Sequence, residues 1–82
     1  MSDSNKSATA MRALNVMEFL GEAGRPVSVV DVAKGIRVDR STAYRMLMTL
    51  REAGYVIRDS THKNYQLGYK LLSLSRNLLT TP

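Results

Sequence analysis

The chain has 82 residues and a net charge of +5, from 12 lysines and arginines against seven aspartates and glutamates. Hydrophobic residues make up 44% of it, which suits one small folded domain and is too many for a disordered chain. The absence of cysteine excludes disulfides and thiolate metal sites, and it fits a reducing cytoplasm. No apolar run approaches the roughly 20 residues that a membrane span needs, and residues 1–7 lack the apolar segment of a signal peptide.

Catalysis and metal binding are also disfavoured. The single histidine, His62, has no nucleophile or carboxylate at a catalytic spacing, and no glycine-rich phosphate loop is present. One histidine supplies only one of the four ligands of a typical zinc site. We therefore expect no enzyme activity, no metal and no cofactor. The excess of positive charge indicates a polyanionic partner instead.

The first half of the chain predicts two helices after a disordered tail over residues 1–7. Apolar residues at three- and four-residue spacing predict a helix from Ala8 that Gly24 ends. Val27 is expected to form a strand of one or two residues. Ser28 is the expected cap of a short second helix, and 35–38 is the expected turn after it. The stripe of the first helix consists of Ala10, Met11, Ala13, Leu14, Met17 and Leu20.

The second half predicts a third helix, a hairpin and a last helix. Asp39 caps the third helix, over 39–53, with Thr42 at its third position. Strands are expected at 55–58 and 65–67, joined by the polar turn 59–64, and a helix over 69–79. This order predicts a mainly α fold with a small β-hairpin, a winged helix-turn-helix over residues 8–68, followed by a linker helix within 69–82.

The third helix has the two faces that a recognition helix needs. Its apolar stripe consists of Ala43, Met46, Leu47 and Leu50, and its opposite arc of Ser41, Arg45, Met48 and Glu52. Hydroxyls and an arginine near its start suit groove edges and phosphates, and the free backbone N–H groups of its first turn suit a phosphate. Residues 34–63 hold seven basic and three acidic side chains, so they carry four of the five net positive charges.

The run Val38-Asp39-Arg40-Ser41-Thr42-Ala43-Tyr44-Arg45-Met46-Leu47, with the later Ala53-Gly54-Tyr55-Val56 and Tyr65-Gln66-Leu67-Gly68, resembles the helix-turn-helix of IclR-family bacterial transcription factors. The first helix, Ala13-Leu14-Asn15-Val16-Met17-Glu18-Phe19-Leu20, is similar too. This resemblance covers residues 10 to about 76. It implies a DNA-binding domain, a linker helix and a C-terminal domain that senses a small effector. Because that last domain is absent, we expect the chain to be a truncated piece of a longer regulator.

Three positions depart from the family pattern. Arg37 stands where the family usually has a glycine with positive φ, so we expect a turn of different shape there. Asp39 replaces a frequent proline and caps well. At the wing tip Asn64 replaces the usual glycine, and we expect it to adopt the left-handed conformation.

The candidate DNA-binding residues are Arg40, Ser41, Thr42, Tyr44, Arg45, Thr49 and Lys63. Arg45 and Lys63 are alternatively solvated surface charges, and the two hydroxyls at 41 and 42 are alternatively capping groups alone. Tyr44 either packs against the wing or touches the DNA backbone. The wing, 59–64, is expected on the DNA backbone or in the minor groove.

The leucines of the last helix pack either on the domain's own core or on a second subunit. Leu71, Leu74 and Leu78 have a spacing that suits a dimer seam, and the resemblance implies a homodimer through the first and linker helices. The leading hypothesis is a cytoplasmic, nucleoid-associated bacterial regulator that binds an inverted-repeat operator in double-stranded DNA. It would sense a small effector through the absent domain and contact no membrane. A winged helix that binds an acidic protein is the alternative, and an enzyme fragment is a third hypothesis.

Overall fold

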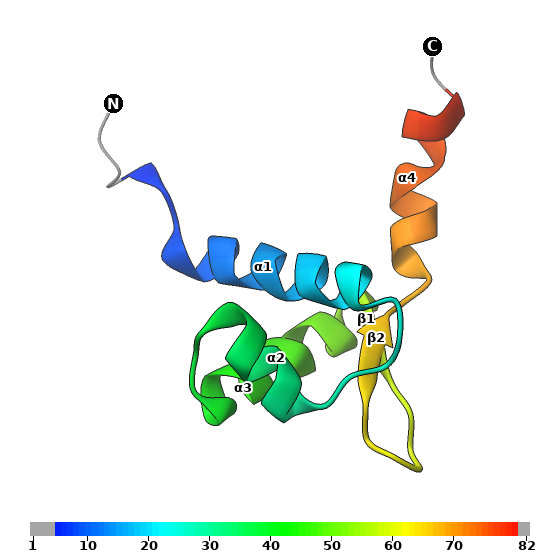
Figure 1. The fold of residues 1–82 in the computed structure, drawn as a ribbon. Helices are drawn as coiled ribbons and strands as arrows, with labels where there is room; N and C mark the ends of the chain where they lie inside the picture. The colour runs from blue at the N-terminus through cyan, green and yellow to red at the C-terminus, as the bar shows by residue number, and fades with distance from the viewer. Residues whose placement is uncertain (1–4, 81–82) are drawn as a thin grey trace.

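The computed structural model describes residues 5–80, which fold into four helices and one antiparallel hairpin. In chain order these are α1 (Ala8–Ala23), α2 (Val29–Ile36), α3 (Arg40–Glu52), β1 (Val56–Arg58), β2 (Tyr65–Leu67) and α4 (Lys70–Thr80). α1 lies across α2 and α3, and the hairpin stands beside them (Figure 1). The predicted mainly α fold with a small hairpin is confirmed. Over the described range, no helix is long and apolar enough to cross a membrane.

Side-chain caps begin the first three helices. The hydroxyl oxygens of Ser7 and Ser28 accept the N–H groups three residues further on, each at 3.1 Å, and Asp39 caps α3 in the same way. Gly24, at φ 65°, ends α1 as predicted. Ser7, the last residue of the predicted tail, is thus the cap of α1, and residues 1–4 of that tail lie outside the described residues.

The core lies beneath α1, between α2, α3 and the hairpin. Its buried side chains come from α1, α2, α3, both strands and the loop before α2: Val16, Leu20, Val27, Val32, Ala33, Ala43, Leu47, Val56 and Tyr65. The stripe predicted for the third helix lies in this cluster. The stripe predicted for the first helix is wrong except at Leu20: Val16 is the other buried residue of α1, while Met11 and Leu14 are 51% and 54% exposed. This packing fixes the angle at which α3 presents its other face to solvent.

The hairpin is joined to the helical part by a third short segment. In the hairpin itself, Val56 lies opposite Leu67 and Arg58 opposite Tyr65. Val27 adds an isolated bridge: its N–H donates to the Tyr65 carbonyl at 2.9 Å, and the Tyr65 N–H donates to the Val27 carbonyl at 2.7 Å. The predicted short strand at Val27 is thereby confirmed.

The turn after α2 differs from the prediction. The helix runs to Ile36, so the turn expected over 35–38 begins two residues late. Gly35 stays helical, with its Cα facing the ring of Phe19 so closely that a Cβ would collide with it. The left-handed residue is Arg37, at φ 63° and ψ 51°, and its N–H donates to the Ala33 carbonyl. The expected change of turn shape is therefore wrong, because arginine adopts the glycine-like conformation despite its steric cost.

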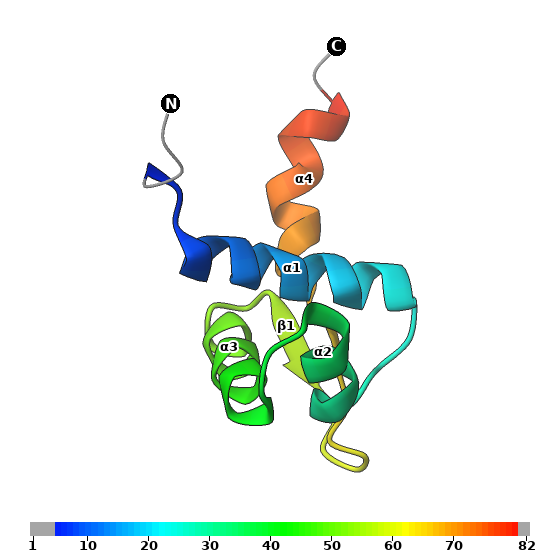
Figure 2. The same cartoon turned by 60° about the vertical axis from the view of Figure 1, so that its left-hand side comes forward.

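α4 extends away from the rest of the domain. It begins and ends one residue later than predicted, and none of its residues is buried. In Figure 2 it rises beyond α1, on the side of α1 opposite to α2 and α3. Leu72, Leu74, Leu78 and Leu79 are 58–81% exposed. Packing on the domain's own core, one of the two predicted alternatives, is therefore wrong for these four leucines, while Leu71 is half-buried.

Candidate nucleic-acid interface

The first turn of α3 is organised by the Asp39 carboxylate. Its Oδ2 accepts the Thr42 N–H at 3.1 Å and the Ser41 hydroxyl at 2.6 Å, and its Oδ1 accepts the Thr42 hydroxyl at 2.6 Å. These donors, the Ser41 hydroxyl foremost, hold the pKa of Asp39 well below its usual range. Asp39 is therefore ionised at neutral pH and fixes the orientation of both hydroxyls.

This arrangement decides what the hydroxyls of α3 offer to a ligand. A hydroxyl has one hydrogen and two lone pairs, and the hydrogens of Ser41 and Thr42 are directed at Asp39. Thr49 likewise donates its hydroxyl hydrogen to the Arg45 carbonyl at 3.0 Å. All three hydroxyls therefore keep lone pairs free to accept from a ligand; Ser41 and Thr49 are exposed and Thr42 is half-buried. A lone pair can accept a hydrogen bond from the amino group of cytosine or adenine in the major groove. A phosphate oxygen has no hydrogen to donate, so it does not match a lone pair.

The predicted phosphate site at the start of α3 needs correction for the same reason. The Thr42 N–H, one of the free backbone donors expected there, is occupied by the Asp39 carboxylate. A negative charge also sits where the partial positive charge of the helix N-terminus would attract an anion. The first turn of α3 is therefore better suited to base edges than to phosphates.

The two faces of α3 differ sharply in exposure. Ala43 and Leu47 are fully buried, and Met46 and Leu50 are half-buried against them. The opposite arc, Ser41, Arg45, Met48 and Glu52, is exposed along the whole helix. Tyr44 is 48% exposed on the flank of α3 that also carries Arg40 and Arg51. The third helix thus packs with its apolar stripe and leaves its polar arc accessible, as predicted.

The wing tip is stabilised by Asp59. Its Oδ1 accepts the N–H groups of Thr61 at 2.8 Å and His62 at 2.6 Å, with the His62 bond the main reason that its pKa is lowered. The Lys63 N–H donates to the Asp59 carbonyl at 3.0 Å. Lys63, at φ 58°, takes the left-handed position, so the prediction for Asn64 is wrong by one residue. The turn closed on Asp59 places the reversal one residue earlier.

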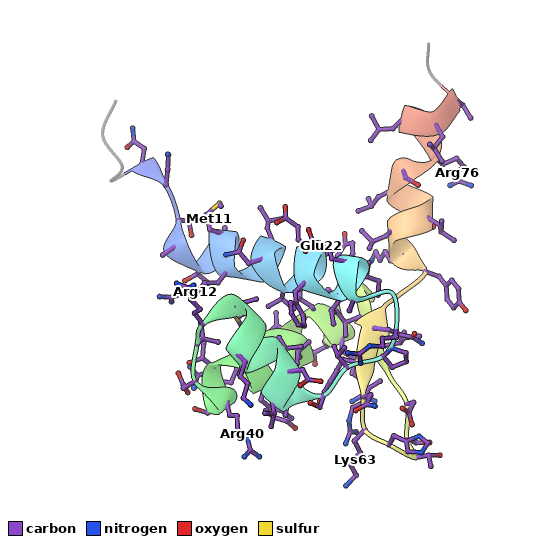
Figure 3. The ribbon with its side chains drawn as sticks, in the orientation of Figure 1. Met11, Arg12, Glu22, Arg40, Lys63 and Arg76 are labelled. Carbon is purple, nitrogen blue, oxygen red and sulfur yellow. The ribbon has the colours of Figure 1, made fainter. Side chains whose placement is uncertain are left out.

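The exposed cations of α3 and the wing are available to a ligand. Among residues 5–80, Arg40, Arg45, Arg51 and Lys63 form no ion pair; the pair that is present joins His62 Nδ1 to Asp59 Oδ1 at 3.7 Å. Figure 3 shows Arg40 beneath α3 and Lys63 at the wing tip, both on the side of the molecule remote from α4. Over the same described range, no cluster of acidic or histidine side chains is suited to a metal.

The structure places six of the seven candidate residues on α3 and the seventh, Lys63, on the wing. Two participants in this surface are not among the candidates. Asp39 is predicted only as a cap, although it also orients Ser41 and Thr42. Met48 is 37% exposed between Arg45 and Glu52, and its helical position in the sequence already indicates that it shares their arc.

A core of three helices, an exposed third helix and an adjoining β-hairpin define a winged helix-turn-helix domain. Residues 9–60 match the model of the IclR helix-turn-helix domain. Because this match covers more than half of the chain, the chain belongs to the IclR family.

Curated relatives agree with this assignment. The glycerol operon regulatory protein of Streptomyces coelicolor is 32% identical over 68 residues, which are 83% of this chain and 27% of that protein. The transcriptional regulator KdgR of Escherichia coli is 26% identical over 72 residues, 88% of this chain and 27% of that protein. These relatives are regulators rather than enzymes. The chain spans about a quarter of their length.

Solved structures show the same fold. The IclR protein of Thermotoga maritima superposes with a TM-score of 0.78 at 30% identity, over 90% of this chain and 30% of that one. An IclR-family regulator from Brucella abortus gives a TM-score of 0.87 at 22% identity, over 99% and 31%. The Zα domain of PKZ from Carassius auratus, solved in complex with Z-DNA, gives a TM-score of 0.69 at 26% identity, over 74% of this chain and 98% of that one.

Proposed function

We propose that this chain is the DNA-binding domain of a bacterial transcriptional regulator and that α3 lies in the major groove of its operator. The observation that carries the proposal is the exposed arc of α3, where Arg45 is free of ion pairs beside hydroxyl lone pairs that are free to accept. Arg45 would donate to guanine, and Ser41 and Thr42 would accept from amino groups of adjacent bases. The low apolar content of this arc disfavours the alternative of a protein-binding winged helix.

The remaining candidates surround this arc. Arg40 and Tyr44 would contact the sugar-phosphate backbone on one flank, and Thr49 a base on the other. Lys63, exposed at the wing tip, would contact backbone or minor groove. Phosphate contacts of this kind fix register without reading sequence.

We also propose that two copies associate through α1 and α4. The support is the exposed apolar surface on these helices, which includes Met11 and Leu14 on α1 and Leu74 and Leu78 on α4. A two-fold dimer would place two copies of α3 in successive major grooves, so its operator would be an inverted repeat.

Membership of the IclR family supports three further points of the proposal. The domain of residues 8–68 would be followed by α4 as a linker to an effector-sensing domain, and regulation would be exerted through that domain. The protein would act by binding DNA and not by catalysis, since the relatives are regulators. It would work at the nucleoid in the bacterial cytoplasm.

Selection of bound duplexes from a random library, at near-physiological salt, tests the proposal. The chain should enrich an inverted repeat whose half-sites lie about one helical turn, or a multiple, apart. Arg45→Ala should weaken binding to that operator by about 1–3 kcal/mol and binding to unrelated duplexes much less. Arg76→Ala on α4 removes the same charge far from α3 (Figure 3) and should bind as the unmodified chain does.

Two results would overturn the proposal. If no sequence is enriched at any salt concentration, α3 does not read bases. If Arg45→Ala weakens binding to all duplexes equally, Arg45 contacts phosphate, and the arc does not read the base sequence as proposed.

A further inference from the structure

A groove of about 290 Å³ lies between the N-terminal half of α1 and α3. Half-buried apolar side chains, Ala13, Met46 and Leu50, form its floor. Exposed polar side chains line its edges: Thr9 and Arg12 from α1, and Arg45 and Thr49 from α3. Thr42 completes the lining. The groove therefore borders the face of α3 proposed to enter DNA.

Arg12 occupies an unexpected position on α1. It precedes the fully buried Val16 by one helical turn, so it lies on the stripe of α1 that faces the core. Thr9, seven residues before Val16, lies on that stripe too. Both are exposed because α1 extends beyond the core and overhangs α3. Figure 3 shows the Arg12 side chain directed from α1 toward the α3 side of the molecule.

The side chains around the groove carry net positive charge. Two arginines line it, and its lining contains no carboxylate. Within the part of the chain that the structure describes, neither arginine forms an ion pair, and the Thr9 hydroxyl has no hydrogen-bond partner. The unpaired Arg12 guanidinium and the free Thr9 hydroxyl can both donate to the oxygens of a phosphate, and Arg45 adds positive charge nearby.

The position of the groove selects the phosphate source. A helix in the major groove has one phosphate backbone on each side of it. The wing and the flank with Arg40 and Arg51 supply cations on one side. The groove lies on the opposite flank, beside Thr42 and Thr49, where α3 itself has no cation other than Arg45 on its arc.

We propose that Arg12, with Thr9, binds a backbone phosphate of the operator strand that borders α3 on its α1 side. This inference rests on the proposed function. It adds α1 to the DNA-binding surface, so that α3 is held between phosphate contacts on both flanks. Arg12 would contribute affinity and register, while Arg45 remains the residue that reads a base.

The test compares Arg12→Gln with Arg76→Gln, which removes an equal charge from the remote helix α4. Affinity is measured for the selected operator and for an unrelated duplex over a series of salt concentrations. Arg12→Gln should weaken binding to both duplexes about five- to tenfold. It should also reduce the magnitude of the slope of log affinity against log salt by about 1. Arg76→Gln should leave affinity and slope unchanged. Arg12→Lys, which retains the charge, should recover most of the loss.

Phosphate-ethylation interference locates the contact. Ethylation of one phosphate per half-site should weaken binding by the unmodified chain and should not weaken binding by Arg12→Gln any further. The inference is overturned if Arg12→Gln binds like the unmodified chain, if it loses affinity for the operator alone, or if sedimentation shows that it has lost self-association. If the unmodified chain binds no duplex, it is the proposed function that fails.

Discussion

Asp39 combines two tasks in one side chain. It caps α3 through the Thr42 N–H, and it orients the hydroxyls of Ser41 and Thr42. A proline, the residue that the family resemblance implies at this position, would do neither. The acceptor character of the first turn of α3 is therefore a property of this sequence rather than of the fold.

Replacing Asp39 by asparagine should change which bases are selected. The amide offers one acceptor oxygen in place of two, so at least one hydroxyl is released to donate outward. Library selection with Asp39→Asn should therefore show a weaker preference for amino-bearing bases opposite the first turn of α3. Preference at the guanine assigned to Arg45 should persist. An unchanged selection profile would contradict the role given to the hydroxyls.

The same carboxylate makes stability depend on acid pH. Because folding lowers the pKa of Asp39, ionisation favours the folded state. The stabilisation is complete above the usual carboxyl range, about pH 4, and is lost as pH falls toward the lower pKa of the folded protein. The thermal unfolding temperature of the unmodified chain should therefore fall steeply below about pH 4. Asp39→Asn should unfold at lower temperature at neutral pH and show a shallower acid decline, while a parallel decline would contradict this assignment.

Arg37 is strained at the end of α2. A left-handed conformation costs a non-glycine residue roughly 1–2 kcal/mol. Arg37→Gly removes this cost but gains freedom in the unfolded chain, so the free energy of unfolding should rise by up to about 1 kcal/mol in denaturant titrations. Gly24→Ala tests the backbone effect alone, because Gly24 is at φ 65° and has nothing within 4 Å of an added Cβ. This substitution should lower the free energy of unfolding by about 1 kcal/mol. No gain for Arg37→Gly would show that arginine compensates the strain.

At the scale of elements, the hairpin depends on a close approach at its base. A Cβ on Gly68 would lie 2.7 Å from the Gly54 carbonyl oxygen and 3.2 Å from the carbonyl carbon of Tyr55. Both are backbone atoms, and the Gly68 N–H donates to the Tyr55 carbonyl at 2.8 Å. The chain entering and the chain leaving the hairpin can therefore pack together only if residue 68 has no side chain.

Gly68→Ala should lower the free energy of unfolding by about 1–3 kcal/mol, since backbone must shift to admit the methyl group. Gly21→Ala is its matched control. Gly21 lies within α1, and its Cβ would meet the Leu67 side chain at an ordinary 3.4 Å. The free energy of unfolding of Gly21→Ala should rise by about 0.5–1 kcal/mol, because alanine has a higher helix propensity than glycine. Equal effects of the two substitutions in chemical denaturation would contradict the proposed close approach.

Local chemistry in the sequence predicts most of these elements. Caps at Ser28 and Asp39, the stop at Gly24 and the apolar stripes give the helices within one or two residues. One set of errors lies in the turns, where the left-handed residues are Arg37 and Lys63 rather than the residues favoured by propensity. Another lies on α1, where Val16 is buried and the predicted Met11 and Leu14 are exposed. A cap or stripe is a local pattern, whereas turn conformation depends on hydrogen bonds closed across several residues.

The candidate interface was predictable to the same extent. The exposed arc of α3 follows from periodicity alone. The hydrogen-bond state of its hydroxyls does not, since it depends on rotamers around Asp39. The groove beside Arg12 joins residues more than 30 positions apart, and its existence depends on the packing of α1 over α3.

At the scale of the whole molecule, α4 is an unpartnered arm. Four of its five leucines are exposed, Leu71 is half-buried, and no other element packs extensively against it. Exposed apolar surface of this kind marks an association site. Leu74→Glu combined with Leu78→Glu should therefore abolish self-association in sedimentation equilibrium and leave the circular dichroism spectrum unchanged.

The matched control for this pair is Ser73→Glu combined with Asn77→Glu, which adds the same charge at exposed polar positions of α4. It should associate as the unmodified chain does. Operator binding by the leucine variant should change from two occupied half-sites to one. Retained association of the leucine variant would contradict the assignment of α4 to the interface.

The bridge between Val27 and Tyr65 has a mechanical consequence. Because both residues are buried and joined by two backbone hydrogen bonds, the base of the wing is tethered to the α1–α2 connection. We therefore expect α3 and the base of the wing to move together. Gly68 is still held by its hydrogen bond to the Tyr55 carbonyl, so we expect the pivot between the compact part and the arm to lie at Tyr69, which is 77% exposed. We expect tolerance to half-site spacing to be set by rotation at that pivot, and not by adaptation within the surface that touches the bases.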